Sequence, residues 1–151
     1  MAFNFRLEAL LRLRKSLKEQ AEQELARWIR RRENVINIIR QLKSDIETER
    51  HKLNVNISNG IKASEYQQQV EYIDLLFRKL TYRTEQLKSI EDNLIKARQL
   101  LKERHMELQV VEKLKEKAYD KYLFEEFQKE QKEADELATI KYISKQQADI
   151  S

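Results

Sequence analysis

The feature that most constrains this chain is a seven-residue apolar repeat between Ile73 and Val111. Its two series stand three residues apart and are apolar at ten of twelve positions: Ile73, Leu80, Leu87, Leu94, Leu101 and Leu108, with Leu76, Arg83, Ile90, Ala97, Arg104 and Val111. A helix with such a seam buries one narrow stripe against a partner helix. The repeat therefore predicts a coiled coil, and the next question is which segment packs against it.

The composition excludes an ordinary globular core. Charged residues make up 37% of the 151 residues, against roughly 25% in an average domain. There is one Gly and no Pro, so few sharp turns are available. These features predict an all-α protein with a small number of very long helices.

A second seam precedes the first and supplies the partner helix. Its two series are Ala21, Trp28, Val35 and Leu42, with Leu25, Ile39, Ile46 and Leu53, interrupted by Arg32. Residues 54–64 break the pattern and contain the single glycine, Gly60. We therefore predict a long antiparallel coiled-coil hairpin: a helix over about 3–57, a turn over about 58–63 and a helix over about 64–143. It would form one elongated domain over 1–151, with a disordered tail at 144–151.

The position of the turn predicts the register of the hairpin. With the turn centred near Gly60, the residue numbers of facing partners add up to about 122. The predicted pairs are Trp28 with Leu94, Val35 with Leu87, Leu42 with Leu80, and Ile46 with Leu76. Phe3 would lie near Tyr119, so residues from about 120 onward would have no partner within the chain.

The open end of the hairpin has more apolar residues than one partner helix requires. Beyond Tyr122 the apolar stripe changes face, and residues near the N-terminus lie off the seam. Residues 1–32 carry net charge +5 and residues 116–136 carry −4. This combination is typical of a docking surface, although a frayed end or a homodimer contact would give the same pattern. The candidate docking residues are Phe5, Leu7, Leu11, Phe124 and Phe127.

Several classes of function are disfavoured. There is no Cys, and His51 and His105 are far apart in the predicted hairpin, so no metal-site spacing exists. One glycine cannot build a phosphate-binding loop, and a two-helix rod has no concave pocket in which carboxylates could converge. We therefore predict no enzyme activity, no metal and no cofactor. No apolar run approaches the ~18 residues of a membrane span, and no signal peptide is evident, which predicts a cytoplasmic protein without membrane insertion.

The densest basic run is Arg30, Arg31 and Arg32, together with Arg27. Such a run can bind phosphates. Successive helical residues point about 100° apart, however, so the run does not form one face. The net charge of +4 is also modest. A solvated helix surface is the favoured interpretation, and nucleic-acid binding is disfavoured.

Exposed aromatic residues mark a second candidate surface. Tyr72, Leu75 and Tyr82 lie off the seam at helical spacing, and Phe77 is nearby. Such a stripe is either a partner site or a widening of the hairpin contact, and the pattern does not decide between them. Lys79 and Arg83 interrupt it.

Both ends of the chain resemble a known family. The opening FNFRLEALLRLRKSLKEQAEQELA resembles the N-terminus of the FliJ family of bacterial flagellar export proteins. The later VEKLKEKAYDKYLFEEFQKEQKEADELA is similar to the C-terminal segment of that family, and its matching residues are Glu130, Lys132, Asp135, Glu136, Leu137 and Ala138. Length, the absence of Cys and the single central break agree, so the resemblance covers nearly the whole chain.

The resemblance implies a monomeric, stalk-like coiled coil at the cytoplasmic face of the cell membrane, at the flagellar base. The implied partners are the hexameric export ATPase, which receives the terminal end, the export-gate membrane protein, and the chaperones of export substrates. It adds Asp135 and Glu136 to the docking candidates, and the stripe at Tyr72, Leu75, Phe77 and Tyr82 suits the gate. The alternative from the residues alone is a generic coiled-coil scaffold or homodimeric structural protein, and a basic nucleic-acid binder ranks third.

Overall fold

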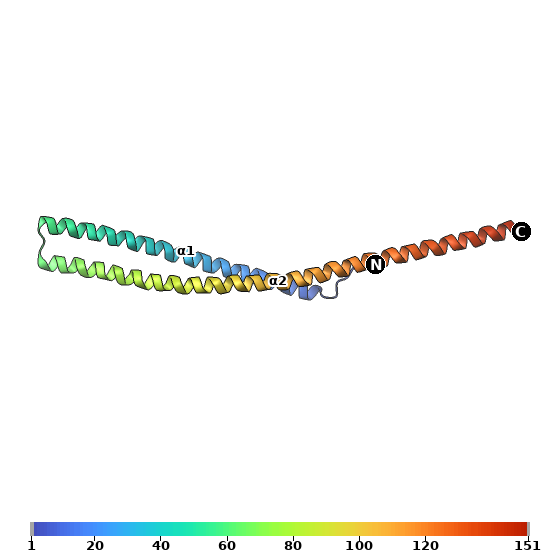
Figure 1. Ribbon diagram of the computed structural model, residues 1–151, viewed down its shortest axis with the longest axis horizontal. Coiled ribbons are helices and arrows are strands. Elements are labelled where there is room, and N and C mark those ends of the chain that lie inside the picture. Colours follow the sequence, from blue (N-terminus) through green and yellow to red (C-terminus); the bar gives the residue numbers. More distant parts are fainter. Residues whose placement is uncertain (1, 151) are drawn as a thin grey trace. The chain divides into compact units, whose positions relative to one another are not determined.

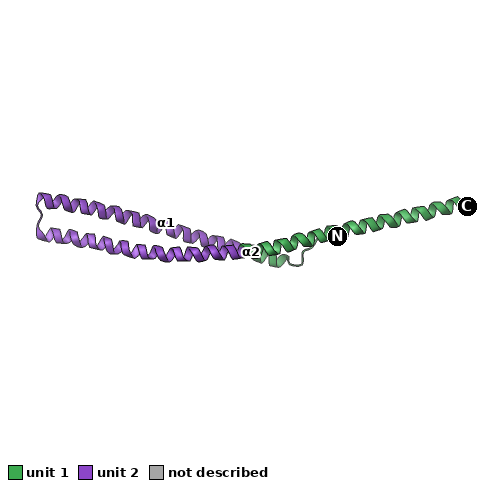
Figure 2. Cartoon of the chain, in the orientation of Figure 1, with its two compact units in different colours: residues 1–17, 105–151 green, residues 18–104 purple. Residues whose placement is uncertain are grey.

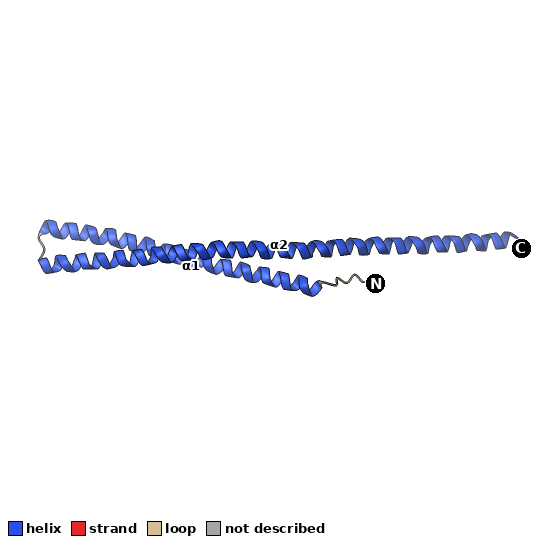
Figure 3. Ribbon diagram, turned by 60° about the horizontal axis from the view of Figure 1, so that its bottom comes forward, coloured by secondary structure: helices blue, strands red, loops and turns tan. Residues whose placement is uncertain are grey.

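The protein is an all-helical hairpin in the computed structural model, which describes residues 2–150 (Figure 1). Helix α1 spans Glu8–Asn59 and helix α2 spans Ala63–Ile150. Three residues, 60–62, join them, and no strand occurs within residues 2–150 (Figure 3). The predicted two-helix hairpin is therefore confirmed.

Two predicted helix boundaries were wrong. The first helix begins at Glu8 and not near Phe3. In a helix, Phe3 and Phe5 would point about 200° apart, whereas the irregular segment lets both side chains pack on α2. At the other end, α2 continues to Ile150 instead of stopping near Ile143. Residues 144–150, predicted to be disordered, contain no Gly or Pro that would end the helix; Ser151 lies outside the described residues.

The chain divides into two compact units, which are described separately (Figure 2). The terminal unit comprises Met1–Leu17 and His105–Ser151, and the central unit comprises Lys18–Arg104. The single elongated domain predicted from the sequence stays a prediction.

The central unit is held by two clusters of seam residues. In one, Val35, Ile90 and Leu94 are buried, with Leu25, Trp28, Ile39 and Leu87 packed against them. In the other, Leu42, Ile46 and Leu76 are buried, with Leu80 packed against them. The members of each predicted pair therefore lie in the same cluster. The Nε atom of Arg32 lies 3.6 Å from Glu91 Oε1, which agrees with the predicted register.

The terminal unit follows the same register. Its core contains Phe5, Leu11, Leu108 and Val111, with Phe3, Leu7, Leu10 and Ala118 packed against it. The ring centroids of Phe3 and Tyr119 lie 5.2 Å apart in an edge-on contact, as the register predicted. Two ion pairs flank this core: Arg14 with Glu107 at 2.8 Å and Lys115 with Glu8 at 3.1 Å. Partner numbers again add up to about 122.

Gly60 ends α1 in a conformation that other residues rarely adopt. Its φ is +84°, and its N–H donates to the carbonyl oxygen of Ile57 at 3.3 Å. We expect Gly60→Ala to lower the free energy of unfolding by about 1 kcal/mol, because an L-residue pays that cost in the left-handed region. A Cβ atom at this position would meet nothing within 4 Å, so the cost comes from the backbone alone.

Urea unfolding followed by circular dichroism measures the effect of Gly60→Ala. The matched control is Gly60→Asn, which should lose less stability because asparagine tolerates this conformation better than alanine. A Gly60→Ala variant as stable as the wild type would show that the turn relaxes to another conformation.

Candidate partner-binding surfaces

The described residues carry no site for metal chemistry. Within residues 2–150, no three side chains of His, Cys, Asp or Glu are placed to hold a metal ion together. Neither α1 nor α2 contains a stretch apolar and long enough for a membrane crossing. The candidate sites predicted from the sequence are surfaces that a partner could cover.

The first surface, which we call the tip surface, is the exposed part of α2 around Phe124 and Phe127. These rings are 60% and 63% exposed, and every residue from Phe127 to Ile150 is exposed. Residues three apart are neighbours on a helix surface, so the two rings form one apolar patch. Asp135 lies on the same side of α2 as Phe127, about 80° around the helix, whereas Glu136 lies about 180° away. The structure thus brings Phe124, Phe127 and Asp135 to one face, and Glu136 to the other.

The three N-terminal docking candidates are placed differently. Phe5 and Leu11 are buried, at 9% and 2% exposure, and Leu7 is half-buried against the same cluster. They hold the N-terminal segment on α2 instead of facing outward. The burial of Leu7 and Leu11 could have been predicted from their spacing, because they precede the seam residues Ala21 and Leu25 by two heptads.

A groove of about 410 Å³ lies beside this N-terminal segment in the terminal unit. It is lined by Phe3, Asn4, Phe5, Arg6, Leu7, Leu114, Ala118, Lys121, Tyr122 and Glu125. Sequence reasoning missed it because it exists only where the irregular N-terminal segment leaves the helical path. The groove places a mixed polar and apolar lining on the same unit as the tip surface.

The second surface, which we call the aromatic stripe, lies on α2 in the central unit. Tyr72, Leu75 and Tyr82 are exposed and fall within about 80° of one another around the helix. Phe77 points about 140° away from Tyr72, and its ring lies 5.0 Å from the guanidinium carbon of Arg50 on α1. Three of the four predicted residues therefore share a face, and Phe77 lies on the other flank of the seam.

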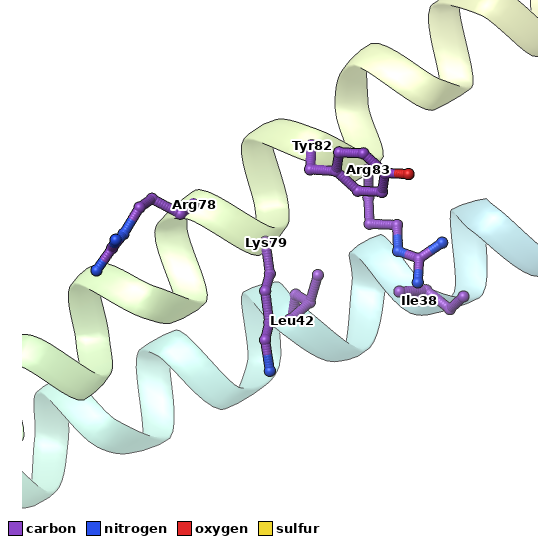
Figure 4. Close-up of a pocket in the computed structure, with 6 residues that line it drawn as sticks. All are labelled: Ile38, Leu42, Arg78, Lys79, Tyr82 and Arg83. Atoms are coloured by element: carbon purple, nitrogen blue, oxygen red, sulfur yellow. The ribbon is translucent and has the colours of Figure 1, made fainter.

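A second groove, in the central unit, adjoins the aromatic stripe (Figure 4). Its lining comprises Ile38 and Leu42 of α1, with Arg78, Lys79, Tyr82 and Arg83 of α2. Sequence reasoning treated Lys79 and Arg83 as interruptions of the stripe and did not single out Ile38. The signal that could have found the groove is the register, which brings Ile38 and Leu42 opposite this part of α2.

The basic run on α1 does not converge on one site. Arg27 pairs with Glu24 at 2.6 Å, and Arg32 pairs with Glu91 at 3.6 Å. The Arg31 guanidinium lies 4.7 Å from the ring centroid of Trp28. Three arginines thus contact three different neighbours, which supports the interpretation of a helix surface over that of a phosphate site.

A family model and a sequence relative point to one family. The family model for the flagellar FliJ protein matches residues 3–147. The Flagellar FliJ protein of Bacillus subtilis (strain 168) is 26% identical over 147 residues, which cover 95% of this chain and 97% of that protein. The structure of a YscO homolog from Chlamydia trachomatis gives a TM-score of 0.42 at 21% identity, covering 97% of this chain and 99% of that one.

Proposed function

The chain belongs to the FliJ family of non-enzymatic flagellar export components, and from this premise we propose that it is a stalk that docks into the export ATPase ring. It would promote ring assembly or turnover and link the ring to the export gate. Its place of action would be the cytoplasmic face of the membrane at the flagellar base. The observation that carries the proposal is the exposed pair Phe124 and Phe127, at the start of a stretch of α2 in which every residue from Phe127 to Ile150 is exposed.

The tip surface supplies two kinds of attraction to a ring. Exposed aromatic side chains are the side chains that most often anchor an interface. Residues 116–136 also hold eight acidic and four basic residues, so their charge would steer the segment toward a basic lining. A stalk favours assembly only by the difference between its affinity for the ring and its affinity for free subunits.

The aromatic stripe is the proposed contact with the gate. It lies in the central unit and the tip surface lies in the terminal unit, so different residues would serve the two partners. Tyr72, Leu75 and Tyr82 are all exposed, which supports a partner site over a widened hairpin contact. The substrate chaperones are proposed as partners from the family alone, with no surface assigned.

Titrating the purified export ATPase with this protein tests the proposal. We expect ATP turnover to rise with added protein and to saturate, because the ring form becomes populated as the stalk binds it. A pull-down from the cytosol of a flagellated bacterium should retain the same ATPase. Absence of both stimulation and binding would contradict the proposed function.

The alternative of a homodimeric scaffold makes a different prediction about mass. In the proposed stalk, the seam residues of α2 pack against α1 of the same chain. Sedimentation should therefore give a monomer mass that does not change with protein concentration. A mass that doubles as concentration rises would favour the scaffold.

A further inference from the structure

The groove beside the aromatic stripe combines an apolar floor with a cationic rim. Ile38 and Leu42 provide the floor, and the cations come from α2. Figure 4 shows Lys79 beside Leu42 and Arg83 beside Ile38, both reaching toward α1, while Arg78 points away along the outside of α2. The groove has a volume of about 410 Å³.

Among the described residues, no acidic side chain pairs with the cations of this rim. No carboxylate of residues 2–150 forms an ion pair with Arg78, Lys79 or Arg83. The Arg83 guanidinium instead donates to Gln86 Oε1 at 2.8 Å and lies 5.6 Å from the ring centroid of Tyr82. The carboxylate of Asp45, on the following turn of α1, accepts a hydrogen bond from Gln41 at 2.9 Å.

Some other cations of the same unit have carboxylate partners, although several, such as Lys88 and Lys102, form no such ion pair among residues 2–150. Arg27 pairs with Glu24, Arg32 with Glu91, and Arg50 with Glu47. The rim thus gathers three cations that form no ion pair with a carboxylate of residues 2–150, next to the exposed side chain of Ile38. A ligand complementary to it needs negative charge at its edges and apolar side chains at its centre.

We propose that this groove binds an acidic, amphipathic segment of a partner protein. Apolar side chains of that segment would pack on Ile38, Leu42 and the ring of Tyr82. Its carboxylates would lie at Lys79 and Arg83, with Arg78 at the outer edge of the groove. The inference rests on the proposed function, because the groove adjoins the stripe assigned to the export gate, and it adds the chemistry of the segment that the gate would present.

The groove favours a peptide over the two other anionic partners. A phosphate group or nucleic-acid backbone would satisfy the cations but leave the apolar floor uncovered. A lipid surface would meet Arg78 and Lys79 but could not place headgroups on the floor, which Leu42 forms at the hairpin seam. An amphipathic helix carries both kinds of side chain at the required spacing.

Charge reversal at the rim tests the inference. The variant is Arg78→Glu with Lys79→Glu, both exposed. The matched control, Lys88→Glu with Lys102→Glu, makes the same charge change at exposed positions of α2 that do not line the groove. The probe is a labelled synthetic helical peptide with leucines on one face flanked by glutamates, and a lysine-flanked counterpart serves as the negative probe.

The expected result is selective loss of binding measured by fluorescence anisotropy. The glutamate peptide should bind the wild type and the control equally, bind the rim variant about tenfold more weakly, and bind more weakly as salt rises. The lysine peptide should not bind. Equal affinity of the two variants for the glutamate peptide would overturn the inference. It would also be overturned if phosphatidylserine vesicles bound in a rim-dependent manner while the peptide did not bind.

The purified cytoplasmic domain of the gate protein separates this inference from the proposed function. If that domain does not bind the wild type, the gate contact is wrong, and the peptide measurements still decide the chemistry of the groove. If it binds the wild type and the rim variant equally but loses affinity on Tyr72→Ala with Tyr82→Ala, the gate contact stands and the groove inference fails.

Discussion

Replacing Leu94 by alanine should lower the free energy of unfolding by about 2–4 kcal/mol, the usual cost of a large-to-small change in a packed core. Leu94 is 3% exposed and belongs to the cluster that also holds Val35, Ile90 and Trp28. The hydrogen bond from Trp28 Nε1–H to Glu24 Oε1, at 3.0 Å, opposes movement of the indole ring into the space left behind. The cavity should therefore stay largely unfilled.

Chemical denaturation of the Leu94→Ala variant measures this effect. Lys96→Ala is the matched control on the same helix, and it should change the stability by no more than about 0.5 kcal/mol because Lys96 is exposed. If the two variants lost the same stability, the seam would not be the main contact between the helices in the central unit.

The heptad repeat was sufficient to predict the hairpin because the spacing of the apolar residues alone determines which positions are buried between the two helices. Every predicted seam position between Ile73 and Val111 is buried or half-buried, including the two charged positions, Arg83 and Arg104. The single glycine then predicted the position of the turn, and that position predicted the register of the two helices. Each step depends on local chemistry that is readable in the sequence, so no tertiary information was needed.

The N-terminal segment could not be predicted in the same way. The residues from Phe3 to Leu11 satisfy a helical pattern, and their propensities do not exclude a helix. What decides their conformation is the packing of Phe3 on Tyr119 and Tyr122 and the burial of Phe5. That packing involves residues more than a hundred positions away. The periodicity of the N-terminal segment alone therefore gives no information about it.

The candidate surfaces were predictable to different extents. The exposure of Phe124 and Phe127 followed from the expected lack of a partner beyond residue 120. The groove at Ile38 was not predictable in this way, because residues of both helices line it. Its cations also interrupt an apolar stripe in the sequence, so they were interpreted as interruptions and not as part of a site. A surface that two segments form together can be identified only when the position of each side chain relative to the facing helix is known.

Replacing Phe124 and Phe127 together by alanine should weaken binding to the ATPase ring by about a thousandfold and reduce stimulation of ATP turnover accordingly. Each ring is exposed in the isolated protein, and aromatic anchors at interfaces typically contribute about 2 kcal/mol or more when truncated. Helicity and urea unfolding should change little, because neither side chain belongs to a buried cluster of the described residues. The measurement is ATP turnover by the purified ATPase, titrated with the wild type and the variant.

Tyr72→Ala with Tyr82→Ala is the matched control for that titration. It also removes two exposed aromatic rings, but from the central unit, so stimulation of the ATPase should persist while export through the gate falls. Because both variants lose two rings, a general loss of apolar surface would affect them equally. If the tyrosine pair abolished stimulation and the phenylalanine pair did not, the ring would bind the aromatic stripe, and the two proposed partners would have to be exchanged.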